Sequence, residues 1–183
     1  MEAAPPPDAA PLPGALLPAT LHDREGRVFT VRAYRPEDRP SLERFYDTFE
    51  PKRAAQGLPP EGPARVGRWL DSVLATGTHL IVEAEGALAG HAMLMPTGRE
   101  GVREYAIFLD HAVRGRGVGT RVNRLSAEVA RTLDVRSLWL SVEPQNRPAV
   151  RSYQKAGFRF RPATLYSTEL EMELALDAAP DAA

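Results

Sequence analysis

Apolar residues in the first half of the chain follow a strand period and then two helical periods. Phe29, Val31 and Ala33 alternate with polar residues, which predicts a strand. Two later sets have the i, i+3, i+4 spacing of an amphipathic helix: Leu42, Phe45, Tyr46 and Phe49, then Val66, Trp69, Leu70, Val73 and Leu74. The glycine and prolines within residues 50–63 predict a loop between these two helices.

The second half of the chain alternates strands and helices. Residues 79–83 and 88–95 flank Glu85-Gly86, which predicts a hairpin. A strand over 103–109, a third helix, a strand over 138–142 and a fourth helix follow. In the last strand, apolar-face and polar-face residues alternate: Tyr166, Thr168, Leu170, Met172 and Leu174 against Ser167, Glu169, Glu171 and Glu173. This order predicts an α/β fold with a mixed, twisted sheet.

Composition narrows the class of protein. The length of 183 residues and a hydrophobic share of 43% fit one soluble domain. A net charge of −1 gives no overall field that favours nucleic acid, and no apolar run is long enough to span a membrane. The absence of cysteine excludes disulfides, thiolate metal sites and an acyl-cysteine intermediate. No spacing of His, Asp and Glu predicts a metal site. We expect a cytoplasmic monomer or homodimer.

The two ends of the chain are expected to lie outside the domain. Residues 1–22 are rich in proline and alanine, which predicts a disordered tail; an arm packed on a neighbouring subunit is the alternative. A signal peptide is not expected, because no Lys or Arg precedes Arg24 and prolines interrupt the apolar stretch. The folded domain is expected over 24–175, with a flexible tail over 176–183.

A glycine-rich turn joins the strand over 103–109 to the third helix. It reads Arg114-Gly115-Arg116-Gly117-Val118-Gly119. Free N–H groups at a helix start and the helix dipole favour a phosphate, and the two arginines add positive charge. The turn lacks the lysine of a P-loop, and its spacing differs from the dinucleotide fingerprint. A tight turn without a ligand is the alternative.

A second motif follows the strand over 138–142. It runs from Glu143 to Phe158 and contains Asn146, Ala149, Tyr153 and Gly157. Asn146 suits a helix N-cap and Gly157 suits the position after the helix end. Together the two motifs resemble those of the GCN5-related N-acetyltransferases (GNAT superfamily), whose pyrophosphate loop reads (Arg/Gln)-x-x-Gly-x-Gly/Ala. The resemblance extends from about Val28 to Leu174.

The resemblance implies a GNAT fold with six to seven strands and four helices, in which the strands at 103–109 and 138–142 splay and hold acetyl-CoA. The residues that it assigns to the cosubstrate are Phe108, Leu109, Arg114, Arg116, Gly117, Val118, Gly119, Thr120, Asn146, Ala149 and Tyr153. The backbone N–H of Leu109 or its neighbour would bind the thioester oxygen.

Two of these residues have alternatives. Tyr153 is the expected acid for the thiolate leaving group, because a tyrosine pKa near 10 is close to that of a thiol; the alternative is that Tyr153 only packs against the cofactor. Asn146 is expected near the pantetheine arm, and the alternative role is the helix cap alone.

Glu104 is the expected general base for the attacking amine. It resembles the catalytic glutamate of GNATs that acetylate lysines of acyl-CoA synthetases. Many other GNATs carry their glutamate one residue earlier, where this chain has Arg103. One residue reverses the face of a strand unless a bulge intervenes, so an ordinary exposed glutamate is the alternative.

The histidines and the acceptor region give weaker signals. His111 is expected in a solvated loop rather than near the cofactor, and His79 and His91 are expected to be structural. Lys52 and Arg53 lie in the region that builds the acceptor pocket in GNATs, and could attract an acidic acceptor or form a solvated turn. The acidic face of the last strand could suit a cationic amine or protect a sheet edge.

The predicted function is transfer of an acetyl group from acetyl-CoA to a primary amine of a small molecule, a protein lysine or an N-terminus. Two alternatives stay open: an acyl-CoA-binding or regulatory module without turnover, and a nucleotide-phosphate-binding protein that uses the same glycine loop. The sequence does not identify the amine or the range of acyl groups.

Overall fold

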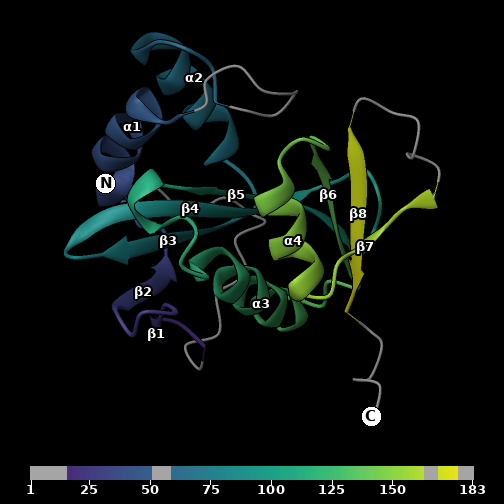
Figure 1. Cartoon of the computed structure of the whole chain (residues 1–183). Coiled ribbons are helices and arrows are strands. Elements are labelled where there is room, and N and C mark those ends of the chain that lie inside the picture. Colours follow the sequence, from purple (N-terminus) through teal and green to yellow (C-terminus); the bar gives the residue numbers. More distant parts are fainter. Residues whose placement is uncertain (1–15, 51–58, 163–168, 177–183) are drawn as a thin grey trace.

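The computed structural model describes residues 16–50, 59–162 and 169–176, and these form an eight-stranded sheet flanked by helices (Figure 1). The strands lie in the order β1-β2-β3-β4-β5-β6-β8-β7. Their bounds are β1 Ala19–His22, β2 Val28–Ala33, β3 Thr78–Ala84, β4 Ala87–Pro96, β5 Val102–Leu109, β6 Ser137–Val142, β7 Arg159–Phe160 and β8 Leu170–Ala175. Neighbouring strands are antiparallel except for the parallel pair β5 and β6. The predicted mixed α/β sheet is therefore confirmed.

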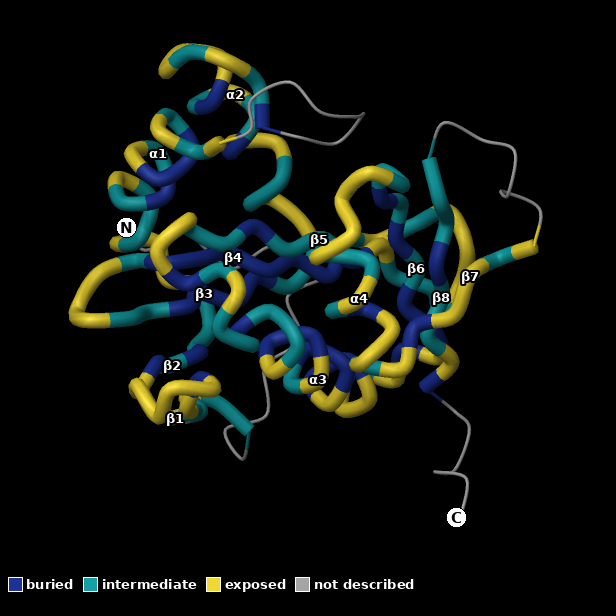
Figure 2. The backbone as a smooth tube through the Cα atoms, viewed as in Figure 1, coloured by how far each residue is buried: buried dark blue, intermediate teal, exposed yellow. Residues whose placement is uncertain are grey.

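The helices cover both faces of this sheet. They are α1 Arg39–Thr48, α2 Pro63–Val73, α3 Val118–Arg131 and α4 Arg147–Lys155, with short 3-10 turns at Pro36–Asp38 and His111–Val113. Successive strand residues point to opposite faces. In β3, Leu80 and Val82 accordingly pack in the core under α3 and α4, whereas Ile81 packs in the core under α1 and α2. Figure 2 shows the resulting layer of buried strands, with exposed residues along the outer sides of the helices.

Local sequence explains the turns that hold this arrangement. Glu85 and Gly86 have φ of 54° and 77°, the two positive values that a type I′ hairpin needs between β3 and β4. Asn146 caps α4 through its side chain, which accepts from the Ala149 N–H at 3.3 Å. At the other end, Phe158 N–H donates to Tyr153 O at 3.1 Å, the long bond of a Schellman motif.

The sequence did not predict β1 and β7, and it did not predict that β8 lies between two other strands. Ala19–His22 forms β1, so the prediction of a tail is wrong for these residues, while residues 1–15 lie outside the described part. β1 pairs with β2 through backbone bonds, which need no distinctive side chains. β7 has only two residues. β8 lies between β6 and β7, and β7 pairs with it at Met172 and Glu173.

The sheet opens between β5 and β6. The two strands pair at Val102↔Ser137, Arg103↔Leu138 and Glu104↔Trp139, and no later described residue of β5 pairs with β6. β5 nevertheless continues to Leu109 and β6 to Val142. Figure 1 shows β6 and β8 running steeply across the direction of β3–β5. The predicted splay of these strands is thus present.

Candidate active site

The glycine loop presents unpaired backbone donors at the start of α3. Gly117 is the N-cap of this 14-residue helix and has φ 86°, a conformation that side chains other than glycine rarely adopt. Among the described residues, none accepts a hydrogen bond from the backbone N–H groups of 115–120. Such donors, reinforced by the helix dipole, favour a phosphate.

The two loop arginines are bonded to other parts of the chain. Arg114 donates to the carbonyls of Leu109 at 2.8 Å and Glu50 at 2.6 Å, and its guanidinium lies 5.1 Å from the centre of the Phe49 ring. Arg116 forms an ion pair with Asp23 at 2.6 Å and donates to the Ala112 carbonyl. In this conformation the backbone N–H groups of the loop are the donors without a partner among the described residues.

Leu109 presents its N–H to the opening between β5 and β6. The N–H of Asp110 donates to Ala89 O at 2.8 Å, and bonding alternates along an antiparallel pair. The Leu109 peptide N–H therefore points away from β4. Its carbonyl also points away from β4, since it accepts from Arg114. A backbone donor at this place can stabilise an oxyanion.

Glu104 lies on the face of β5 that carries α1 and α2. Ala106 and Phe108 pack in the core under these helices, whereas Tyr105 packs in the other core. Pairing with β4 is regular from Gly90↔Leu109 to Pro96↔Arg103, without a bulge. Glu104 is thus on the α1–α2 side and Arg103 on the opposite one. Glu104 remains accessible to solvent, and the neighbouring protein desolvates its carboxyl in part, which raises the pKa of this group.

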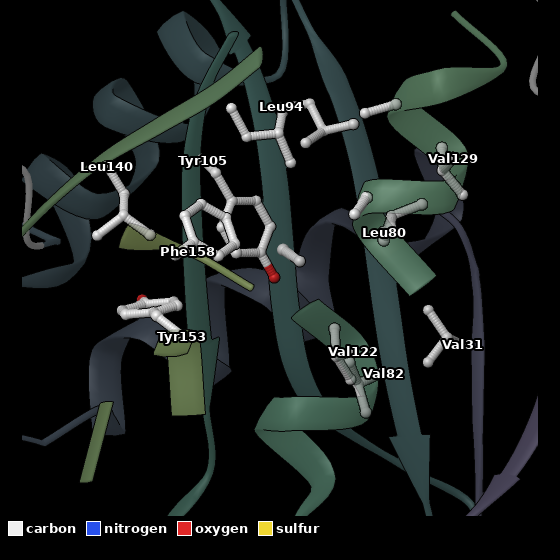
Figure 3. Packing of buried hydrophobic residues seen from close by; sticks show 14 of the residues in the cluster. Val31, Leu80, Val82, Leu94, Tyr105, Val122, Val129, Leu140, Tyr153 and Phe158 are labelled. Atoms are coloured by element: carbon white, nitrogen blue, oxygen red, sulfur yellow. The ribbon is translucent and has the colours of Figure 1, made fainter. Parts of the chain in front are cut away.

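Tyr153 lies on the other side of the opening, on α4. Its ring packs against Tyr105 and Phe158, with centroids 6.3 Å and 5.6 Å away (Figure 3). The ring is buried, and the burial raises the pKa of the hydroxyl, which stays protonated at neutral pH. Among the described residues, none hydrogen-bonds to this hydroxyl, so it can donate to a ligand.

Comparison with known proteins decides the family. The sequence profile of the Acetyltransferase (GNAT) family matches residues 41–158, which is more than half of the chain. The chain belongs to the GNAT family. The predicted membership is confirmed.

Two solved structures and one relative are similar to this GNAT chain. The GNAT domain of S. lividans PAT has a TM-score of 0.73 at 20% identity, over 89% of this chain and 98% of that one. YncA of Salmonella typhimurium, solved with its cofactor acetyl-CoA, has a TM-score of 0.65 at 22% identity, over 85% and 99%. Streptothricin acetyltransferase from Streptomyces lavendulae is 34% identical over 86 residues, 45% of this chain and 44% of that protein, so the match spans less than half of that relative.

The remaining predicted residues of the GNAT motifs lie in the two cores and at the contact between α3 and α4. Phe108 and Val118 are buried core residues, and Ala149 packs against the same core as Val118. The Thr120 hydroxyl lies 3.1 Å from Ser152 Oγ, which also accepts from Asn123 Nδ2 at 3.2 Å. This polar link fixes the start of α3 against α4. Asn146 caps α4, which is the alternative role that the sequence suggested for it.

A buried chain of hydrogen bonds lies beside the site on the α1–α2 side. His79 Nε2 contacts the carbonyl of Thr76 at 2.8 Å, so this nitrogen carries the proton. His79 Nδ1 then accepts from His91 Nε2 at 3.1 Å, and His91 Nδ1 accepts from the Tyr46 hydroxyl at 2.7 Å. Both histidines are buried and hydrogen-bonded within the fold, which agrees with the structural role expected for them. The sequence shows each residue, but not that α1 places Tyr46 over the strands.

Other predicted features lie outside the opening between β5 and β6. His111 is exposed, as predicted. Lys52 and Arg53 lie outside the described residues. Within the described part of the chain, no group of three or more His, Cys, Asp or Glu could hold a metal ion, and no helix is long and apolar enough to cross a membrane. A hollow of about 430 Å³ lies at the far end of α3, lined by Arg131, Asp134, Val135, Arg136 and Leu176, and is separate from the opening between β5 and β6.

Proposed function

We propose that this protein transfers the acetyl group of acetyl-CoA to a primary amine by direct attack. One observation supports this proposal most. The unpaired N–H groups of 115–120 and the outward N–H of Leu109 lie at the same opening in the sheet. The first can bind a pyrophosphate and the second a thioester oxygen. A regulatory module needs a pyrophosphate site to bind acyl-CoA, but it does not need a donor for the thioester oxygen.

Glu104 is the proposed base. A primary amine with a pKa of about 10.4 is almost entirely protonated at pH 7, so proton removal limits attack. Glu104 is on the side of the sheet where α1 and α2 lie, which is where GNATs build the acceptor pocket. A carboxyl with a raised pKa is a stronger base than an ordinary one, directly or through a water molecule.

Tyr153 is the proposed acid. When the amine nitrogen bonds to the carbonyl carbon, the carbonyl electron pair moves to the oxygen, and its return breaks the carbon–sulfur bond so that the thiolate leaves. The Tyr153 hydroxyl supplies the proton or, because burial raises its pKa above that of a thiol, a hydrogen bond that precedes proton transfer. It regains the proton from solvent. Charge on the sulfur is stabilised in either case.

The acceptor is proposed to be a small-molecule amine first, since the named relative is a streptothricin acetyltransferase. A protein lysine or N-terminus is the second class to test. Calorimetry with CoA, ATP and NAD tests the cosubstrate, and we expect heat of binding with CoA alone. Binding of ATP or NAD with an affinity equal to that of CoA would instead favour a general nucleotide-phosphate site.

A further inference from the structure

The turn between β1 and β2 is fixed to the glycine loop. The Arg24 N–H donates to the Arg116 carbonyl at 2.9 Å, and Arg116 Nε donates to Asp23 Oδ2 at 2.6 Å. The N–H groups of Glu25 and Arg27 hold the same carboxylate, at 2.8 Å and 2.9 Å. Burial acts to raise the pKa of Asp23, but these hydrogen bonds lower it overall, so the carboxylate stays ionised at neutral pH. Residues remote in sequence therefore complete one side of the loop.

This contact places the Arg24 side chain directly against Gly117. A methyl group built on Gly117 would lie 3.0 Å from Cγ and 3.1 Å from Nε of Arg24. Arg24 is exposed, and its guanidinium has no hydrogen-bond or ion-pair partner among the described residues. Arg114 and Arg116 differ in this respect, because both guanidinium groups are already bonded. Among the described residues of this turn and loop, Arg24 is a cation beside Gly117 whose guanidinium is free to bind a ligand.

We propose that Arg24 binds the pyrophosphate of the cosubstrate together with the N–H groups of the glycine loop. The inference rests on the proposed function, and it adds a binding residue from outside both sequence motifs. A pyrophosphate carries full negative charges, whereas N–H groups and a helix dipole supply only partial positive charge. The guanidinium donates paired, charge-assisted hydrogen bonds that suit phosphate oxygens. Asp23 is a positioning residue, since it neutralises Arg116 and fixes the turn.

The test compares the affinity for CoA of Arg24→Gln and Arg27→Gln by calorimetry. Arg27 lies in the same turn, is equally charged, and is paired with Glu25 at 2.9 Å, so its substitution is the matched control. We expect Arg24→Gln to weaken CoA binding by about 10-fold, Arg27→Gln to change it little, and Arg24→Lys to retain part of the affinity. Thermal unfolding of each variant checks that the turn remains folded.

Dephospho-CoA, which lacks the 3′-phosphate, distinguishes the phosphate groups. We expect the same loss with this ligand, because the pyrophosphate remains. Equal affinities of wild type and Arg24→Gln would overturn the inference, as would equal losses in both glutamine variants or a loss that disappears with dephospho-CoA. If the wild type itself binds neither ligand, the proposed function fails first.

Discussion

Glu104 illustrates how one residue of register decides a chemical role. The sequence leaves open whether Glu104 or the position of Arg103 faces the acceptor side, because a bulge reverses the outcome. The regular pairing of β4 with β5 removes this ambiguity and places Glu104 on the side of α1 and α2. The sequence identifies Glu104 as the candidate base, but the pairing of β5 with β4 is needed to define the face of the sheet on which Glu104 lies.

Substitution of Glu104 by glutamine tests proton removal. We expect kcat/KM to fall by about 100-fold or more near neutral pH and to recover partly at high pH, where the amine loses its proton unaided. Arg103→Gln, on the opposite face of the same strand, is the control and should retain activity. A loss that is equal at every pH would show a substrate-binding role instead.

Tyr153 and Tyr105 are neighbouring buried tyrosines, and we expect substitution by phenylalanine to lower activity at Tyr153 and stability at Tyr105. Tyr153→Phe should lower kcat by about 10- to 1000-fold and change the KM for acetyl-CoA little, because the departing sulfur loses its donor. Tyr105 donates to the buried Asn123 Oδ1 at 2.9 Å. Tyr105→Phe should therefore lower the free energy of unfolding by about 1–3 kcal/mol. Steady-state kinetics and denaturant unfolding of both variants separate these roles, and full activity in Tyr153→Phe would leave Tyr153 as a packing residue.

The sequence predicts the loop between β5 and α3, but it does not predict that the turn between β1 and β2 packs against this loop. Glycines and arginines before a helical period indicate a phosphate loop from local sequence alone. The turn after β1 reaches the loop from 93 residues away, through the contact of Asp23 with Arg116. The prolines near the N-terminus also conceal β1, whose four residues pair mainly by backbone. The pairing between β5 and β6 ends after Glu104↔Trp139, and no Gly or Pro marks this point in the sequence, so only the family resemblance predicted it.

A charge placed in the loop should act on ligand binding more than on the fold. Gly117→Asp adds a side chain and a negative charge where the phosphate approaches, and we expect CoA affinity to fall strongly. Gly86→Asp introduces a similar positive-φ strain, at φ 77° rather than 86°, in the distant β3–β4 turn and should leave affinity unchanged. Comparison of CoA titrations with thermal unfolding of both variants provides the check. Unchanged affinity in a folded Gly117→Asp protein would contradict the placement of the pyrophosphate.

The stability of the whole molecule should depend on pH through the buried histidines. Burial lowers the pKa of His91 well below its ordinary value, with a further contribution from His79, and burial lowers the pKa of His79 too. Below about pH 6.5 the unfolded chain binds protons that the folded one does not, so stability falls as pH falls. The slope is at most about 1.4 kcal/mol per pH unit for each histidine.

Denaturant unfolding between pH 7 and pH 5 measures this effect. His91→Gln should show a shallower decline in the free energy of unfolding than the wild type, although it is less stable at pH 7. His111→Gln, at an exposed loop position, is the control and should keep the wild-type slope. Identical slopes in the wild type and His91→Gln would mean that the buried histidines do not set the pH dependence.

At the scale of the whole molecule, we infer that the opening after Glu104↔Trp139 holds the phosphate donors and the oxyanion donor for acetyl transfer, and that Glu104, at the last paired position, serves as the base. The most direct test is to incubate the purified protein with acetyl-CoA and a panel of amines that includes streptothricin, and to measure free thiol and acetylated amine together. We expect thiol release that depends on the amine and equals the N-acetyl product mole for mole. Tight acetyl-CoA binding without amine-dependent thiol release, across small amines and lysine peptides, would contradict it and indicate a binding module.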